Sequence, residues 1–291
     1  MRLPSSIYWH GLGVWGIRSF LGSITTYPNS IDAFYRSNKN SSDDEEEIEG
    51  CCQRRHNWDP SLPAPPEEFP QEASFKLTRE EAEYLKDLVM SRCTGTMLAW
   101  LLHLEGNIES AEFPWQVPNI EKFPQDIREQ LIHAQNFSEA IHGSVLLYNL
   151  MLAEKLKESD WVEGYRNSLK LWADNLYLRR DELSQWDHEK PFYEIVVSQG
   201  GRPSDRTKDF INAWLEMALS PGEAKRIADS PEARKLIYNR EISLKKALAR
   251  LENKRTLELW QGASGTSQLK YRWNPTKRIV MDILEGLKRD K

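Results

Sequence analysis

The stretch from Phe137 to Leu156 (FSEAIHGSVLLYNLMLAEKL) restricts the fold of this chain more than any other part of its sequence. Its apolar residues recur at helical spacing, with Phe137, Ile141 and Tyr148 near one face and other apolar residues widening that stripe. A helix that is apolar nearly all round is a buried one. We therefore predict an all-α protein, an irregular multi-helix bundle arranged around this buried central helix.

Gly143 lies in the middle of the predicted central helix. Glycine destabilises a helix interior by about 1 kcal/mol relative to alanine, so another interaction has to compensate for it. We expect that interaction to be a close helix crossing at this position.

Start signals and apolar periodicity predict further helices on both sides of the central one. The clearest start is the capping box Thr78-Arg79-Glu80-Glu81, whose first and last side chains each bond the other's backbone N–H. The other predicted helices cover or begin at 28–36, the residues after Gly95, Pro124, Asp160, Ser204 or Asp205, 231–251, and Asn274-Pro275. Residues 192–197 fit either a strand or a helical turn.

Composition divides the chain into four segments. Residues 1–37 form an aromatic and glycine-rich segment expected to pack on the main domain, and residues 38–72 form a long loop that is first acidic and then proline-rich. The acidic part near 43–49 cannot bury enough apolar surface to order itself, so we expect disorder there. Residues 73–220 make the helical core domain, and residues 221–291 make a basic helical C-terminal segment.

The overall composition is typical of a soluble protein of the cytoplasm. Hydrophobic residues make up 40% and charged residues 29% of the 291 positions, which allows a sizeable core. The three cysteines do not form a disulfide framework, which favours a reducing compartment. The longest apolar run, residues 97–102, is far shorter than the roughly 20 residues that span a bilayer, so we expect no membrane association.

The charge of the chain is unevenly distributed. Residues 222–291 hold 17 Lys and Arg against 9 Asp and Glu, out of 39 and 44 in the whole chain. This part therefore carries a net charge of +8, and the remainder carries −13. Such an asymmetry fits a basic surface for a polyanion, or else an acidic linker combined with ordinary solvated helix faces.

Residues Gly11 to Gly16 (GLGVWG) match the formal pattern G-x-G-x-x-G. That pattern binds a dinucleotide only when it follows a strand, opens a helix and lies in a βαβ unit. At most four residues could form a preceding strand here, and Trp15 would crowd a phosphate. We predict a tight turn at which backbones pack closely, and we predict no cofactor.

The sequence contains no strong metal or catalytic motif. Cys51, Cys52 and His56 lie near one another, but adjacent cysteines in an acidic loop make a poor zinc site, so we predict no metal. His142 and Tyr148 on the central helix are the candidate catalytic residues, because a buried histidine near a tyrosine can act as a general base. The alternative is a core histidine whose hydrogen bonds are satisfied.

A basic and aromatic cluster precedes the last predicted helix. It contains Lys270, Arg272, Trp273, Lys277 and Arg278, with Tyr271 between the first two. The cations would neutralise phosphates, and Tyr271 or Trp273 could stack on a base, so this cluster is the candidate nucleic-acid-binding site. In the alternative, both aromatic residues pack the last helix and the cations stay solvated.

Several long stretches resemble an uncharacterised bacterial domain-of-unknown-function family (six-three-six-one). They are LPSSIYWHGLGVWGIRSF (3–20), NWDPSLPAPPEEFP and SFKLTREEAEYL within 57–104, FSEAIHGSVLLYNLMLAE from residue 137, and the closing LKYRWNPTKRIVMDILEGL. Family members usually carry additional sequence before the first of these stretches. The resemblance therefore implies that this chain is a truncated product or an alternative start, which would leave its aromatic opening exposed.

The resemblance also implies a setting near helicase-type and phage-defence genes, and it supplies no catalytic residues. We therefore expect a non-enzymatic accessory subunit in a nucleic-acid-directed defence system. Its partners would be nucleic acid, through the basic C-terminal segment, and a protein, through the N-terminal apolar patch. The alternatives are a cryptic enzyme with a pocket near His142 and a purely structural scaffold.

Overall fold

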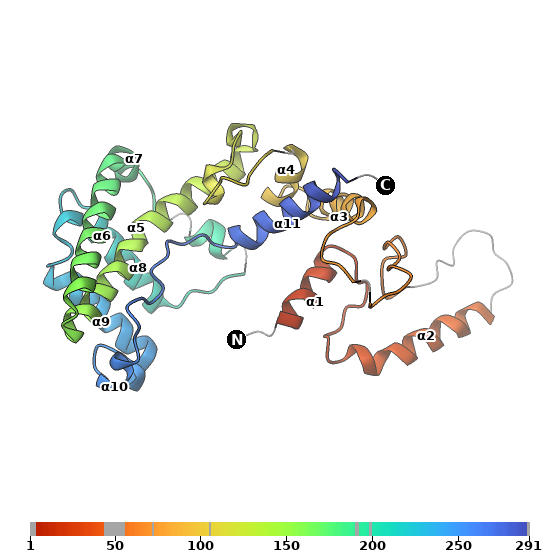
Figure 1. The fold of residues 1–291 in the computed structure, drawn as a ribbon, viewed down its shortest axis with the longest axis horizontal. Coiled ribbons are helices and arrows are strands. Elements are labelled where there is room, and N and C mark those ends of the chain that lie inside the picture. Colours follow the sequence, from red (N-terminus) through yellow and green to blue (C-terminus); the bar gives the residue numbers. More distant parts are fainter. Residues whose placement is uncertain are drawn as a thin grey trace. The chain divides into compact units, whose positions relative to one another are not determined.

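The computed structural model of the chain describes residues 4–43, 56–71, 73–104, 106–189, 192–197 and 200–289. These residues are mainly helical (Figure 1), and the only strand-like pairing among them is an isolated antiparallel bridge between Arg18 and Trp58. The predicted all-α fold class is confirmed. The predicted disordered acidic stretch lies, from residue 44 onward, outside the described residues, as do Cys51 and Cys52.

The chain forms two compact units. One consists of Met1–Ala111 together with Arg272–Lys291, and the other is Glu112–Tyr271. These limits differ from the four segments drawn from composition. The last helix packs with helices from the N-terminal third of the sequence, and no change in composition marks that association.

The helices of the first unit are α1 (Pro4–Val14), α2 (Tyr27–Asp43), α3 (Arg79–Arg92), α4 (Met97–Leu104) and α11 (Trp273–Gly286). The predicted capping box at Thr78 and Glu81 starts α3 and is confirmed. Helix α11 packs on α3 and α4, and a Cβ added at Gly286 would lie 2.6 Å from Ala82 Cβ. Such a short separation shows that α11 and α3 meet at backbone contact distance.

An aromatic cluster of Trp9, Phe20, Tyr27 and Trp58 holds the N-terminal part of the first unit together. The Tyr27 ring centroid lies 5.1 Å from that of Trp9 and 5.2 Å from that of Phe20. The Trp58 indole N–H donates to the Tyr27 hydroxyl over 2.8 Å, so the polar edges of these rings are also paired. This cluster joins α1 and the start of α2 to residues that follow the acidic stretch.

The structure corrects the tight turn predicted for the G-x-G-x-x-G pattern. Gly11 and Gly13 lie inside α1, and Gly16 follows its end with φ of +81°. The Gly16 amide donates to the Gly13 carbonyl over 3.2 Å, which is one of the bonds that close a helix on a left-handed glycine. The pattern therefore ends a helix, because Gly16 supplies the backbone conformation that a helix stop requires and the earlier glycines do not interrupt the turns.

The second unit contains the central helix. Its elements are η1 (Pro114–Gln116), η2 (Ile120–Lys122), α5 (Gln125–Leu156), α6 (Ser159–Leu178), α7 (Arg180–Ser184), η3 (Phe192–Val197), α8 (Asp205–Leu219), η4 (Ala224–Arg226), α9 (Pro231–Lys245), η5 (Lys246–Leu248) and α10 (Lys254–Glu258). The predicted central helix is confirmed, and it is continuous with the helix predicted to begin at Pro124. Residues 133–137 contain neither glycine nor proline, so nothing there ends the helix.

Helix α5 lies at the centre of the second unit's core. Leu147, Leu150 and Leu152 are fully enclosed, and α5 packs along α6 and against α8 and α9 (Figure 1). Two indoles enter from neighbouring helices. The N–H of Trp172 on α6 donates to the Glu139 carbonyl over 2.8 Å, and that of Trp214 on α8 donates to the Ala140 carbonyl over 2.9 Å.

The close contact expected at Gly143 is present, but it is made by an indole ring and not by the backbone of a crossing helix. A Cβ added there would overlap the six-membered ring of Trp172. Because Gly143 has no side chain, the indole can lie against the helix and reach the carbonyl of Glu139, one turn earlier. The compensation for the glycine is therefore a packed tryptophan that also forms a hydrogen bond.

Three other boundaries differ from the predictions. Helix α2 continues to Asp43, past the predicted end at Arg36, because a helix that has formed its first turns adds further residues at little cost. Residues 192–197 form a π-helical turn, which settles the strand-or-helix alternative. Helix α9 ends at Lys245 instead of residue 251, because Lys246 has φ of +51°, which does not continue a right-handed α-helix.

Two glycine-to-alanine substitutions should have opposite effects on stability. Gly164 lies exposed in α6 with no atom within 4 Å of an added Cβ, so Gly164→Ala should stabilise the fold by about 0.5–1 kcal/mol. Gly143→Ala should destabilise it by about 1–3 kcal/mol, because the new methyl displaces Trp172. Urea unfolding midpoints measure both. An equal rise in both midpoints would contradict the packing of Trp172 on α5.

Candidate functional site

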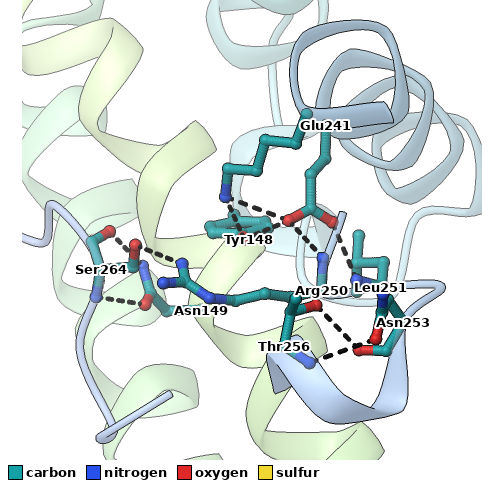
Figure 2. Close-up of polar contacts among 9 residues, drawn as sticks. Tyr148, Asn149, Glu241, Arg250, Leu251, Asn253, Thr256 and Ser264 are labelled. Atoms are coloured by element: carbon teal, nitrogen blue, oxygen red, sulfur yellow. Dashed lines mark hydrogen bonds and ion pairs between the residues drawn. The ribbon is translucent and has the colours of Figure 1, made fainter. Parts of the chain in front are cut away.

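Glu241 on α9 is the one charged residue among the buried residues in the described part of the chain, with 4% of its surface exposed. Its oxygen Oε1 accepts hydrogen bonds from the Tyr148 hydroxyl, from Lys245 Nζ at 3.1 Å and from the Arg250 amide at 3.0 Å (Figure 2). Its other oxygen accepts the Leu251 amide at 2.9 Å. The carboxylate is thus surrounded by donors.

The pKa values of this network follow from burial and from these bonds. Burial alone would raise the pKa of Glu241, but the hydrogen bonds from Tyr148, the two amides and Lys245 outweigh it and hold that pKa below its usual value. Burial raises the pKa of Tyr148, and the hydrogen bond to Glu241 raises it further. At neutral pH Tyr148 is therefore a neutral donor and Glu241 an anionic acceptor.

The path of the chain after α9 explains why several hydrogen-bond donors meet at the carboxylate of Glu241. Helix α9 ends at Lys245, and residues 246–251 turn back so that the amides of Arg250 and Leu251 point at the carboxylate of Glu241. The return continues into α10, whose N-cap Asn253 accepts from the Thr256 amide over 3.2 Å (Figure 2). Glu241 thus holds the α9–α10 connection against Tyr148 of α5.

A separate row of polar side chains on α5 binds residues 262–271, a segment that we call the strap. Ser138, His142 and Asn149 lie along α5 and form hydrogen bonds with the strap backbone at Leu269, Thr266 and Ser264. The order of these partners shows that the strap runs antiparallel to α5. The Tyr271 hydroxyl continues the series by donating to the Ala134 carbonyl over 2.8 Å.

His142 belongs to this row of polar side chains. Its Nε2 lies 2.8 Å from the Thr266 carbonyl oxygen, and a carbonyl only accepts, so Nε2 carries the proton. Two hollows on this unit are lined by other residues. One lies over Glu154, Val162 and Arg166, and the other lies at the end of α6. The geometry gives His142 a partner that positions the strap, as in the alternative of a satisfied histidine.

Because Tyr148 and Asn149 are adjacent on α5, the Glu241 network lies next to the row of side chains that binds the strap. Asn149 both donates to the Ser264 carbonyl and accepts the Ser264 amide, at 3.1 and 2.8 Å. Arg250 connects the Glu241 network to the strap, since its amide donates to Glu241 and its Nη1 donates to the Ser264 hydroxyl over 3.0 Å (Figure 2). The structure therefore brings Tyr148 to Glu241 and brings His142 to the strap, and Arg250 connects the two sets of bonds.

The five residues of the candidate nucleic-acid-binding site are divided between the units. Lys270 belongs to the second unit, where its Nζ lies 2.7 Å from Glu112 and 5.0 Å from the Phe113 ring centroid. Trp273 belongs to the first unit, is 3% exposed and donates to the Ala111 carbonyl over 2.9 Å. Its ring is enclosed by protein in this structure.

The other three members also lie in the first unit and differ in exposure. Lys277 donates to the carbonyls of Glu109 and Ala111 over 3.0 and 3.1 Å. Arg272 is exposed, and so is Arg278, whose side chain is 81% exposed and 3.8 Å from Asp282. The two arginines are therefore the members best placed to meet a phosphate.

No group of three or more His, Cys, Asp and Glu side chains poised to hold a metal ion occurs in the described ranges of the chain. None of the helices that the structure describes is both long enough and apolar enough to span a bilayer.

Replacing Glu241 should destabilise the protein most at neutral pH. Because its pKa is lower in the folded than in the unfolded state, its contribution is present above the unfolded value and is lost as pH falls through the folded one. Glu241→Gln should cost about 3 kcal/mol at pH 7, and the gap to the wild type should narrow on acidification. Denaturant titrations from pH 7 to pH 3 measure this.

The matched control is Glu258→Gln on α10, an exposed glutamate 3.8 Å from Lys254. Its effect should stay within about 0.5 kcal/mol at every pH. A Glu241→Gln protein as stable as this control at pH 7 would show that the carboxylate does not hold the α9–α10 connection.

Sequence reasoning missed Glu241 and the strap, and both depend on contacts between residues about 90–130 positions apart. Comparison with known proteins adds one match: the model of a family of unknown function (DUF6361) covers residues 1–286. No curated protein and no solved structure matches the chain. The resemblance stated from the sequence is thereby confirmed, and the chain belongs to the DUF6361 family of unknown function.

Proposed function

We propose that this protein is a non-enzymatic interaction subunit of a nucleic-acid-directed, phage-defence-type system. The observation that carries the proposal is the surface of α1. This helix (PSSIYWHGLGV) has no Asp, Glu, Lys or Arg, yet several of its apolar residues face solvent. A solvent-facing helix without charge is typical of a surface that another protein covers.

The exposed side of α1 forms one face, which we call the α1 patch: Ile7, Tyr8, Gly11 and Val14. Ile7 is 45%, Tyr8 73% and Val14 50% exposed, and nothing lies within 4 Å of a Cβ added at Gly11. Ile7, Gly11 and Val14 follow helical spacing, so they lie in line. Trp9 is on the other side, in the aromatic cluster, which fixes the orientation of the patch.

The chemistry of the buried polar groups supports a binding role over an enzymatic one. His142 bonds a strap carbonyl, Tyr148 donates to Glu241, and both oxygens of Glu241 are occupied. A general base needs an accessible lone pair and a pKa near the working pH, whereas the pKa of Glu241 is lowered and that of Tyr148 is raised. These groups stabilise the fold.

The nucleic-acid part of the proposal rests on Arg272 and Arg278 and on the net charge of +8 over residues 222–291. Exposed arginines bind phosphate through paired N–H donors, and they do so without giving up structural bonds. The defence setting follows from the family resemblance alone.

The α1 patch should be required for binding a protein partner. We expect Ile7→Lys/Val14→Glu, which leaves the net charge unchanged, to weaken that binding at least tenfold, because a charge pair would enter an apolar interface. The matched control is Leu62→Lys/Phe75→Glu, at two exposed apolar residues of the same unit. The measurement is affinity capture from cells, followed by titration of the purified partner against all three proteins.

Equal loss of binding in both variants, or unchanged binding in the α1 variant, would contradict the role of the patch. A wild-type protein that is monomeric by light scattering and captures no partner would contradict the interaction subunit itself.

The arginines should give salt-dependent nucleic-acid binding. Fluorescence anisotropy with single-stranded DNA, duplex DNA and RNA should show affinity that falls steeply with salt. Arg272→Glu/Arg278→Glu should reduce the slope by about 1 for each phosphate that the variant no longer binds. Lys254→Glu/Arg255→Glu on α10 makes the same charge change elsewhere. Charge reversal at Lys270 or Lys277 is unsuitable, since both hold structural bonds.

Absence of binding at low salt would remove the nucleic-acid part and leave the α1 patch untouched. An equal loss in the α10 control would show that only overall charge matters, with no defined contact.

A further inference from the structure

The second unit has a hollow of about 260 Å³, lined by residues at the end of α6, in α7 and in the turn after α8. Its floor is apolar and belongs to the buried core: Ala173, Leu176, Leu183 and Ala218 are each at most 5% exposed. An apolar cavity of about 150 Å³ holds one benzene molecule. The hollow therefore has room for one ring or two fused rings.

The rim of the hollow is cationic. The guanidinium carbon of Arg180 lies 4.6 Å from the Tyr177 ring centroid, and Lys225 Nζ lies 4.8 Å from the same centroid. The three side chains come from three elements: Tyr177 from the end of α6, Arg180 from the start of α7 and Lys225 from η4, which follows α8. The Tyr177 ring thus gathers two positive charges at one edge of an apolar floor.

The carboxylates near these cations form long ion pairs that are exposed to solvent. Asp174 lies 3.5 Å from Lys225, with 48% of its side chain exposed, and Asp181 lies 3.6 Å from Arg180, with 88% exposed. Ion pairs of this kind contribute little. The hydrogen bond that the structure shows for Arg180 ends on the Tyr177 carbonyl, so the guanidinium keeps further N–H donors for another acceptor.

We propose that this hollow binds a small organic oxyanion, a carboxylate or a phosphate monoester whose apolar part is one or two rings. The rings lie on the floor of Ala173, Leu176 and Ala218, and the anionic head meets Arg180 and Lys225. Among the lining residues, two are cationic and one, Asp181, is anionic, so the hollow favours an anion over a cation. This binding site is independent of the α1 patch and of the nucleic-acid contacts.

The arrangement also separates this ligand from simpler ones. Inorganic phosphate would meet both cations but would leave the apolar floor in water. A neutral aromatic compound would cover the floor but leave two cations without an anion. Only a ligand with both parts uses both features, and a hydrogen bond to a charged group contributes more than one between neutral groups.

The test uses the full chain and isothermal titration with four probes: 2-naphthoate, 1-naphthyl phosphate, neutral 2-naphthamide and inorganic phosphate. We expect saturable binding of at least one naphthyl anion, and at least tenfold weaker binding of the amide and of inorganic phosphate. The comparison of 2-naphthoate with 1-naphthyl phosphate distinguishes a carboxylate head from a phosphate head.

Two double variants assign the site. Arg180→Gln/Lys225→Gln should weaken the bound anion at least tenfold, because it removes both cations of the rim. Arg226→Gln/Lys235→Gln makes the same charge change at two exposed residues outside the hollow and should leave affinity unchanged. A third variant, Ser184→Leu, puts a larger side chain at the mouth from an exposed position of α7 and should block binding while both cations remain.

The proposal is overturned if neither naphthyl anion binds at millimolar concentration, or if the amide binds as tightly as the anions. It is also overturned if the Arg226/Lys235 control loses as much affinity as the rim variant. Saturation-transfer NMR of the same probes confirms that any heat observed comes from the ring contacting protein.

Discussion

The enclosure of residues 138–153 of α5 is the constraint on which the rest of the second unit depends. A helix in that position has to find a partner for each polar group that it buries, because an unpaired buried group costs about 1–3 kcal/mol. The protein meets this requirement differently on each side. Two indole N–H groups reach α5 carbonyls, the strap bonds Ser138, His142 and Asn149, and Glu241 bonds Tyr148.

This use of polar groups bears on function. His142, Tyr148 and Glu241 form hydrogen bonds inside the second unit, and the pKa values of Glu241 and Tyr148 move away from neutrality. The features that remain open lie at the surface: an uncharged helix face, two arginines, and a cationic rim around an apolar hollow. All three are features that a binding surface can use, and the proposed binding role rests on them.

The sequence predicted the parts of the fold that depend on local patterns. Helical spacing located α5, the capping box located the start of α3, and the cost of an interior glycine pointed to a close contact at Gly143. The same reasoning failed at Gly11 and Gly13, where a motif known from turns lies inside a helix. A pattern of glycines does not distinguish a turn from a helix until its neighbours fix the backbone.

The candidate site was predicted only in part. His142 and Tyr148 were found because they lie on the central helix, but their partners Thr266 and Glu241 are 124 and 93 residues away in the sequence. The five residues of the basic cluster are close in sequence, but their surroundings differ. Trp273 and Lys277 donate hydrogen bonds to backbone carbonyls, whereas Arg272 and Arg278 lie exposed at the surface.

The sequence by itself determined the all-α class, the buried central helix and the family, because apolar periodicity, capping residues and long motifs are local properties. Only the tertiary structure decided which polar groups form hydrogen bonds inside the protein and which face solvent. That difference arises because a hydrogen bond between distant segments depends on how helices pack, and a linear pattern does not record packing between residues far apart in the chain. Glu241 shows the difference most clearly: on its helix it is one acidic residue among many charged ones, and in the fold it is buried and holds two helices together.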